Sequence, residues 1–234
     1  MDKRDRNESS RREFIRKTSL VGLGITTSMM SSCKEKEPQE ATKEPGFLNE
    51  QSKKIMGMFN LKYPIFKAAP GGLDLALAVA NAGGMGAIAY LNTDEIAKKK
   101  ISKMEKLTNG NYYVNYILHW PPDTLDAALE AGCKTFEFSW GVPTTEVVSK
   151  IRNAGARFGV QVSSKLNAKR ALEDGPDFLF CQGLEAGGHI QASMSLKHAL
   201  SEILEISNDI PVLVAGGIST GHDIREVINM GGQE

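Results

Sequence analysis

The sequence has little cysteine, no net charge and no long apolar run, and each shortage excludes a class of protein. Only three of the 234 residues are cysteine, which is too few for a disulfide framework, and no pair of them has metal-ligand spacing. The 28 lysine and arginine residues balance the 28 aspartate and glutamate residues, so no basic excess indicates a nucleic-acid partner. We therefore expect a protein without a disulfide framework, a metal site or a nucleic-acid partner.

Residues 1–33 have the composition of an export signal rather than of a folded domain. The paired Arg11 and Arg12 stand before Glu13-Phe14-Ile15, in a close match to a twin-arginine signal. The apolar run over 18–30 is shorter than the roughly 20 residues of a membrane-spanning helix, and it is typical of a signal peptide. We expect the twin-arginine translocase to export the chain in folded form; the alternative is an ordinary basic tail.

Cys33 ends this segment at a motif that resembles a lipobox. The small residues Ser31 and Ser32 precede it, and charged residues resume directly after it. This pattern predicts that Cys33 is lipidated and becomes the mature N-terminus; the alternative is a chance cysteine near a cleavage site. Residues 34–48 are rich in Lys, Glu and Pro and should form a solvated tether. The sequence thus predicts a membrane-anchored lipoprotein on the periplasmic side.

Residues from Tyr63 onward alternate between short β-rich runs and amphipathic helical segments. Several of the helical segments end in glycine, as a left-handed C-cap requires. Strands are predicted at 64–69, 86–90, 112–117, 135–139, 157–162, 178–181 and 211–215. Helices are predicted at 74–81, 94–107, 123–131, 144–153, 165–173, 196–206 and 223–229.

This succession of strand–helix units predicts an α/β fold with an all-parallel sheet and external helices. The candidate architectures are a doubly wound open sheet and a closed (β/α)8 TIM barrel. Regular short units without a nucleotide-binding fingerprint in the first turn favour the barrel, which we place over residues 49–234. Because a complete barrel has eight strands, we expect the chain to be truncated before the eighth strand.

Three glycine-rich segments carry a family resemblance. They are residues 63–72 with the following 80–86, residues 182–189, and residues 210–218. Together they resemble the nitronate monooxygenases, formerly called 2-nitropropane dioxygenases. These are FMN-dependent TIM barrels related to the flavin-dependent enoyl-acyl-carrier-protein reductases. The run Glu185-Ala186-Gly187-Gly188-His189 is the most specific part of the resemblance.

The resemblance implies a flavin site at the carboxyl ends of the strands. FMN is the implied cofactor, and His189 is the implied catalytic residue, which takes the α-proton of the substrate or holds the nitronate anion. Gly216 and Gly217 follow a predicted strand directly, where backbone N–H groups can bind the flavin phosphate. Gly187 and Gly188 would let the backbone lie flat against the planar flavin ring. The amides of Asn115 and Gln182, which stand at strand ends, are implied to form hydrogen bonds with the flavin.

Each of these residues also has a plain structural interpretation. The glycines would serve tight turns, the amides would cap helices, and His189 would be a surface residue. The first segment departs from the family at Lys67 and at Gly71, because family members commonly carry Met after the pair formed here by Ala69-Pro70. Since this region is implied to contact the reactive edge of the flavin, the departure leaves the substrate open.

The predicted function is the FMN-dependent oxidation of alkyl nitronates, which are small molecules, by molecular oxygen. One alternative is a flavin-dependent NAD(P)H enoyl-thioester reductase. The export signal counts against it, because acyl-carrier chemistry and reduced nicotinamides are cytoplasmic. The other alternative is a non-catalytic barrel lipoprotein.

Replacing Arg11 and Arg12 together by lysine should trap the protein in the cytoplasm, because the paired guanidinium groups are the signature of the signal. Cys33→Ala should leave export intact but release the protein from membranes. Cell fractionation followed by immunoblotting measures both effects. Unchanged membrane association of Cys33→Ala would show that Cys33 is not the anchor.

Overall fold

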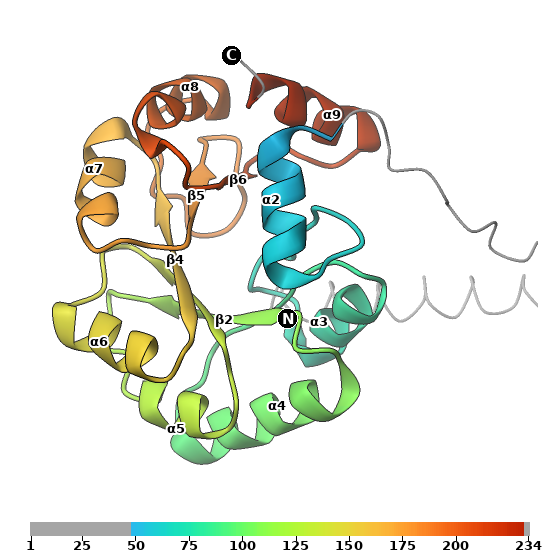
Figure 1. Ribbon diagram of the computed structural model, residues 1–234, viewed down its shortest axis with the longest axis vertical. Helices are drawn as coiled ribbons and strands as arrows, with labels where there is room; N and C mark the ends of the chain where they lie inside the picture. Colours follow the sequence, from blue (N-terminus) through green and yellow to red (C-terminus); the bar gives the residue numbers. More distant parts are fainter. Residues whose placement is uncertain (1–47, 232–234) are drawn as a thin grey trace, which may run out of the picture. The chain divides into compact units, whose positions relative to one another are not determined.

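The computed structural model describes residues 48–231, which belong to one compact unit, Pro45–Glu234. The predicted export signal, Cys33 and all of the predicted tether except Leu48 lie outside the described residues. In the described part, strands lie at the centre and helices surround them (Figure 1). No helix within residues 48–231 is long and apolar enough to cross a bilayer.

The sheet has six parallel strands in the order β1-β2-β3-β4-β5-β6, so each strand pairs with its neighbours along the chain. One helix connects each strand to the next, which is the topology of a TIM barrel and confirms the predicted fold class. The strands are β1 (Gly86–Ile88), β2 (Tyr112–Ile117), β3 (Thr135–Ser139), β4 (Arg157–Val162), β5 (Phe178–Gln182) and β6 (Val212–Ala215). The helices, numbered as in Figure 1, are α2 (Glu50–Phe59), α3 (Gly72–Asn81), α4 (Asp94–Leu107), α5 (Leu125–Glu130), α6 (Thr145–Asn153), α7 (Lys165–Glu173), α8 (Leu196–Ser207) and α9 (Gly221–Met230).

The predicted strand at 64–69 is wrong as a regular strand, because the structure reduces it to a single parallel bridge between Phe66 and Met85. Pro64 has no N–H to donate to a ladder. The ammonium group of Lys67 donates to the carbonyl oxygens of the three residues that follow it, and this bends the chain away from an extended path. The segment still lies beside the start of β1, in the position of the first barrel strand.

Helix α2 has no counterpart among the predicted elements. Asn49 caps it by accepting a hydrogen bond from the N–H of Ser52. The helix covers the amino-terminal end of the barrel, where Phe59 packs edge-on against Phe178 with ring centroids 5.5 Å apart. Its Gln51 accepts a hydrogen bond from a backbone N–H of β6 at 3.0 Å, which fastens the helix to the last described strand.

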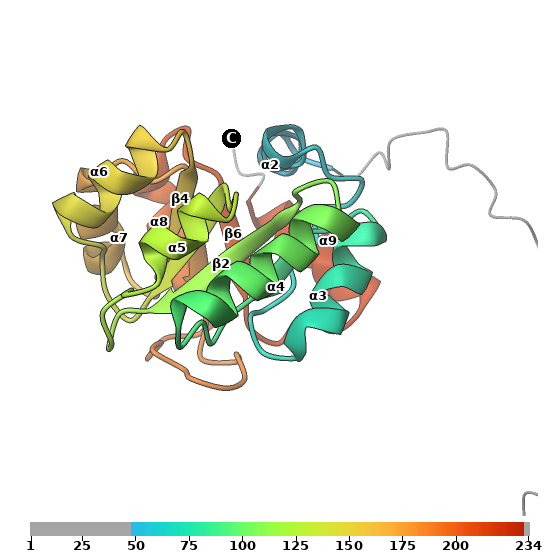
Figure 2. The same cartoon turned by 90° about the horizontal axis from the view of Figure 1, so that it is seen from below.

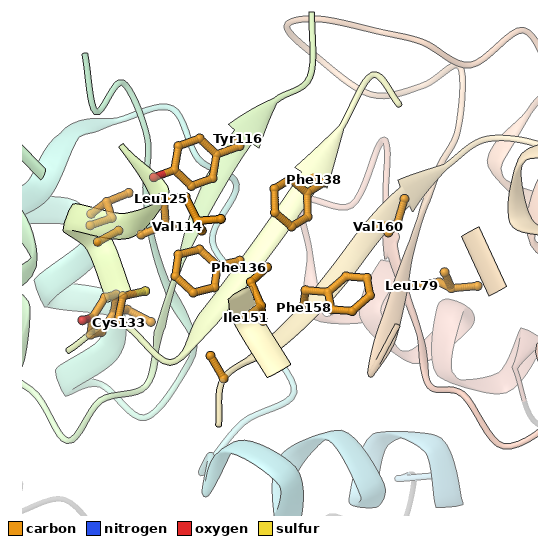
Figure 3. Packing of buried hydrophobic residues seen from close by; sticks show 14 of the residues in the cluster. Val114, Tyr116, Leu125, Cys133, Phe136, Phe138, Ile151, Phe158, Val160 and Leu179 are labelled. Atoms are coloured by element: carbon orange, nitrogen blue, oxygen red, sulfur yellow. The ribbon is translucent and has the colours of Figure 1, made fainter. Parts of the chain in front are cut away.

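Alternate residues of each strand face the helices or the barrel axis. The outward residues Phe136, Phe138 and Phe158 are fully buried beneath the helices (Figure 3). The inward residues near the amino ends of the strands form a second, aromatic cluster together with Phe59 of α2 and Phe66 of the preceding bridge. We call this cluster the barrel plug: Phe59, Phe66, Tyr113, Phe178 and Phe180. Because the plug fills the amino end, the interior has room for a ligand towards the carboxyl ends of the strands.

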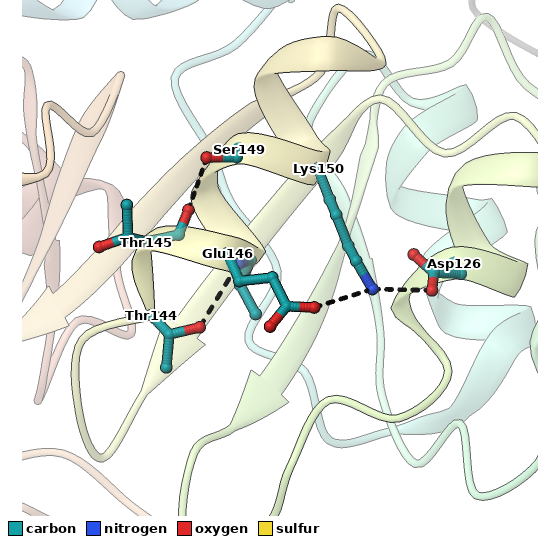
Figure 4. A network of polar contacts seen from close by, with 7 residues as sticks. Asp126, Thr144, Thr145, Glu146, Ser149 and Lys150 are labelled. Atoms are coloured by element: carbon teal, nitrogen blue, oxygen red, sulfur yellow. Dashed lines mark hydrogen bonds and ion pairs between the residues drawn. The ribbon is translucent and has the colours of Figure 1, made fainter.

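Ion pairs join neighbouring helices on the outside of the barrel. Lys150 of α6 contacts Asp126 of α5 at 2.9 Å and Glu146 of its own helix at 3.5 Å (Figure 4). Lys98 of α4 pairs with Glu130 of α5 at 2.8 Å, and Figure 2 shows these two helices along the outer face of β2. Exposed ion pairs contribute little to stability, so the fold depends on the buried faces.

Gly159 on β4 has no space for a side chain, because an added Cβ would lie 2.0 Å from Cε2 of Phe178. Gly159→Ala should displace this ring of the barrel plug and lower the free energy of unfolding by about 1–3 kcal/mol, the usual effect of overpacking a core. Gly57→Ala is the control, since an added Cβ on this exposed helical glycine would meet nothing within 4 Å. The control should stabilise the protein by up to about 1 kcal/mol. Urea unfolding measures both, and equal stabilities would contradict the close approach of the ring.

Candidate functional site

A cavity of about 820 Å³ lies at the carboxyl ends of the strands, within the size range of small-molecule sites. Its wall consists of side chains from β2 to β6 and the loops that follow them, and it continues along β6 to residues of α2, α8 and α9. This is the end of a TIM barrel at which ligand sites are built. Phe66, Tyr113 and Phe180 of the barrel plug line the inner side of the cavity.

The structure brings the described residues that the sequence predicts for the site to this one cavity. They come from β2, from β5 and from the loops after β5 and β6, which are far apart in the sequence. Their placement in one site is observed, whereas their contacts with a flavin stay predictions. The residues are Asn115, Gln182, Gly187, Gly188, His189, Gly216 and Gly217. Cys33, the predicted lipidation site, lies outside the described residues.

Two glycine turns form one side of the wall. Gly216 and Gly217 have φ angles of 140° and 68°, and an added Cβ at Gly216 would lie 3.1 Å from the backbone nitrogen of Ala186. The turn after β6 therefore packs directly against the loop after β5. An added Cβ at Gly187 or Gly188 would meet nothing within 4 Å, so these residues leave open space along the cavity. Backbone N–H groups that no side chain covers suit an anionic ligand.

Helix α9 begins just after the second turn, and one of its own side chains accepts hydrogen bonds from the two residues that precede the helix. Asp223 accepts hydrogen bonds from the N–H groups of Ser219 at 2.9 Å and Thr220 at 2.7 Å. These bonds lower the pKa of Asp223 to about 2, so its carboxyl is charged at neutral pH. The N–H groups of Ser219 and Thr220 are therefore not free for an anion, which leaves the Gly216-Gly217 turn as the exposed backbone at this end of the cavity.

His189 lies in the loop between β5 and α8, and hydrogen bonds tie this loop to the barrel. Gln182 donates to the carbonyl oxygen of His189 at 3.3 Å and accepts from the N–H of Gln191 at 2.8 Å. The side chain of Gln191 then donates to the carbonyl oxygen of Gln161 at 3.0 Å and accepts from the N–H of Trp140 at 3.0 Å. Two amides thus connect the ends of β3, β4 and β5 to the backbone beside His189, which is itself exposed at the mouth of the cavity.

Sequence reasoning misses the positioning residues of this loop. Gln191 stands in no motif, and its role depends on contacts across three strand ends. Glu185 stands inside the glycine-rich motif, where its carboxylate accepts the N–H of Leu196 at 2.8 Å and holds the start of α8. Gly183 lets the loop approach that helix, because an added Cβ would lie 2.4 Å from Cβ of Leu196.

Glu137 is a further site residue that sequence reasoning misses. It lies on β3 opposite Asn115 on β2, and both side chains line the cavity. Burial raises the pKa of Glu137 to about 8, although the hydrogen bond from Asn115 acts in the opposite direction. Its Oε1 atom has no hydrogen-bond partner among the described residues. A buried polar atom without a partner calls for an explanation, and here it adjoins a cavity.

Lys67, one of the departures from the family pattern, shapes the loop that follows the Phe66 bridge. Its ammonium group donates to the carbonyl oxygens of Ala68 and Pro70 at 2.8 Å, Ala69 at 3.2 Å and Ala87 at 3.3 Å. Burial lowers the pKa of this ammonium group. The bonds hold the Ala68–Pro70 loop against the cavity while the charge itself stays behind the wall.

Two aromatic residues at the mouth of the cavity have an uncommon backbone. Tyr90 and Trp140 follow β1 and β3 with φ angles of 58° and 63°, in the left-handed region that residues other than glycine rarely adopt. Such residues cluster at functional sites, where surrounding contacts hold them. Both side chains line the cavity.

Residues 48–231 contain no cluster of three His, Cys, Asp or Glu residues that could hold a metal ion.

Comparison of the sequence with known proteins finds similarity to nitronate monooxygenases. Residues 122–234 match the profile of the nitronate monooxygenase family. Similar sequences include a probable nitronate monooxygenase of Staphylococcus saprophyticus and a nitronate monooxygenase of Paraburkholderia phytofirmans, each 25% identical. The matches cover 78% and 76% of this chain and 65% and 63% of those proteins, so the chain spans a little under two thirds of their length.

Comparison of the structure gives related results. FabK from Thermotoga maritima superposes with a TM-score of 0.70 and 26% identity, over 76% of this chain and 58% of that one. A nitroalkane oxidase from Streptomyces ansochromogenes superposes with a TM-score of 0.66 and 27% identity, over 76% of this chain and 64% of that one. The matched profile contains His189 and both glycine turns. By sequence, fold and the place of these residues, the chain is similar to the nitronate monooxygenases.

Proposed function

We propose that the chain is an FMN-dependent oxidoreductase that oxidises alkyl nitronates with molecular oxygen. The observation that carries the proposal is the meeting of His189, the two glycine turns and the amides of Asn115 and Gln182 in one cavity. The matching family profile and the nitronate monooxygenases of similar sequence support the activity. The structural similarity to a nitroalkane oxidase supports a nitro compound as substrate.

The residues of the cavity fit FMN. The Gly216-Gly217 turn offers backbone N–H groups to a phosphate, and Gly187-Gly188 leave open space against which a planar ring can lie. The unpaired Oε1 of Glu137 provides a polar contact for a ring edge. When bound, FMN would accept electrons from the substrate and pass them to oxygen. The chain's own residues would bind the cofactor, orient the substrate and hold a proton.

His189 would take the α-proton of a neutral nitroalkane or hold the nitronate anion. Its imidazole is exposed at the mouth of the cavity, where a substrate can reach it. Its carbonyl oxygen is held by Gln182, so the backbone that carries the ring is fixed. An imidazole takes up and releases a proton near neutral pH, which suits a general base in this reaction.

The proposal also covers the location of the protein in the cell. The twin-arginine motif at Arg11-Arg12 and the lipobox-like cysteine at Cys33 support an exported lipoprotein whose barrel is tethered to a membrane. Export in folded form suits a protein that must bind its cofactor before it crosses the membrane.

The full chain loaded with FMN should lose its visible flavin absorbance when an alkyl nitronate is added without oxygen, because electrons pass from substrate to flavin. Adding NAD(P)H in the same way should leave the absorbance in place. Anaerobic mixing in a spectrophotometer measures both. Bleaching by NAD(P)H alone would instead assign the enoyl-thioester reductase activity. A folded protein that binds no FMN would leave the non-catalytic barrel as the interpretation.

His189→Asn should retain FMN but oxidise a neutral nitroalkane about 10²–10⁴ times more slowly, the usual contribution of a positioned base. A preformed nitronate needs no deprotonation, so its oxidation should be slowed much less. His198→Asn is the control, because His198 lies exposed on α8 beside Glu202 and does not line the cavity. Steady-state rates with both substrates measure the effect. Equal losses on the two substrates would make His189 an anion-binding residue rather than a base.

A further inference from the structure

Two adjacent strands present three polar side chains to one another at the bottom of the cavity. Asn115 on β2 pairs in register with Glu137 on β3, and Ser139 follows on the same face of β3. All three line the cavity. Tyr113, a member of the barrel plug, precedes Asn115 on the inner face of β2. We call Asn115, Glu137 and Ser139 the floor triad.

Both amide hydrogens of Asn115 are used within the floor triad. Its Nδ2 donates to Oε2 of Glu137 and to Oγ of Ser139, the latter at 3.2 Å. Its Oδ1 accepts no hydrogen bond from the part of the chain that the structure describes, and the residue is partly exposed in the cavity. Asn115 therefore offers the cavity a hydrogen-bond acceptor.

Glu137 offers the cavity a donor. The residue is 4% exposed, and burial raises the pKa of its carboxyl to about 8, so the group is neutral at pH 7. Because Oε2 accepts the hydrogen bond from Asn115, the proton of the neutral acid lies on Oε1. This atom has no partner within residues 48–231. Buried donors without an acceptor are rare in folded proteins, so a ligand is the natural partner.

A donor beside an acceptor matches the edge of a lactam or imide ring, in which a carbonyl lies next to an N–H. We propose that the floor triad binds the pyrimidine edge of the flavin, with Glu137 Oε1–H donating to a ring carbonyl and Asn115 Oδ1 accepting from the ring N–H. The inference rests on the proposed function, because it takes a flavin as the ligand. It adds Glu137 as a recognition residue and states which atom of Asn115 the ring meets.

Ionisation of Glu137 would remove the donor and place a negative charge against the ring carbonyl. From β2 the phenol of Tyr113 faces it; burial raises the pKa of this phenol, and its hydroxyl donates to the carbonyl oxygen of Lys67 at 2.7 Å. The ammonium group of Lys67 is held by backbone carbonyls. On the same face of β4, the uncharged Gly159 pairs with Glu137, whereas Arg157 stands at the exposed amino end of the strand and pairs with Thr135. Flavin affinity should therefore fall as the pH rises through about 8, by up to about tenfold per pH unit above it.

The test is the dissociation constant of FMN, measured by flavin fluorescence on the full chain between about pH 6 and about pH 9.5. Glu137→Gln keeps an acceptor for Asn115 and a donor for the ring but does not titrate. The dissociation constant of FMN from this variant should lie within about threefold of the wild-type value at pH 6. It should stay level at higher pH, where the wild-type protein binds FMN more weakly. Every other group that changes charge with pH is the same in both proteins, so the ratio of the two dissociation constants isolates Glu137.

Two further measurements separate the contacts. Glu137→Leu should bind FMN about tenfold more weakly at pH 6, because the donor is lost, and circular dichroism shows whether this variant is folded. FMN that is methylated at the pyrimidine N–H should bind about tenfold more weakly than FMN to both wild type and Glu137→Gln, because Asn115 loses its donor.

The outcomes distinguish this inference from the proposed function. A wild-type constant that stays level with pH would overturn the inference while FMN binding, and with it the proposed function, stands. The same holds if Glu137→Gln loses as much affinity as Glu137→Leu at pH 6, or if methylation at the ring N–H changes nothing. A folded chain that binds no FMN at any pH would overturn the proposed function and the inference together.

Discussion

The packing of the barrel plug is the constraint on which the site depends. Phe178 lies over the bare backbone of Gly159, and the rings of Phe66, Tyr113 and Phe180 pack around it. These rings fill the inner positions at the amino ends of the strands and form the apolar surface beneath the next layer of side chains. That layer holds Glu137, whose pKa is raised by burial. Tyr113 of the plug lies beside Glu137, so the packing that stabilises the barrel also contributes to the burial that raises this pKa.

The upper part of the site depends on backbone geometry instead. The loop that carries His189 is fixed by amides and carbonyls of Gln182 and Gln191, and the turn at Gly216 packs against it because no side chain intervenes. A loop held in this way presents its N–H groups and one imidazole at fixed places without a hydrophobic core of its own. This arrangement explains why glycines and amides, rather than charged residues, dominate the motif after β5.

How much the sequence predicts follows from how local each feature is. The strands β2 to β6 were predictable because each is a short apolar run bounded by glycine or polar residues, and the strand-end residues Asn115 and Gln182 follow from them. The irregular shape of residues 64–69 could not be predicted, because hydrogen bonds from Lys67 bend this segment. Helix α2 could not be predicted either, because it is fixed by the packing of Phe59 against the rest of the barrel plug. Glu137 could not be found, because it stands within the apolar run of β3, and only the register with Asn115 places it in the cavity.

The lining of the cavity shows why the neutrality of Glu137 matters for binding. Among the described residues that line it there is no lysine, arginine or aspartate. The phosphate of a flavin and a nitronate are both anions, and in the described part of the cavity the backbone N–H groups of the glycine turns and the side chain of His189 are the groups that could face them. A charged carboxylate in the same low-dielectric space would oppose both anions. A protonated Glu137 opposes neither and can still donate a hydrogen bond, so an acid is compatible with an anion-binding cavity here because the barrel plug keeps it buried.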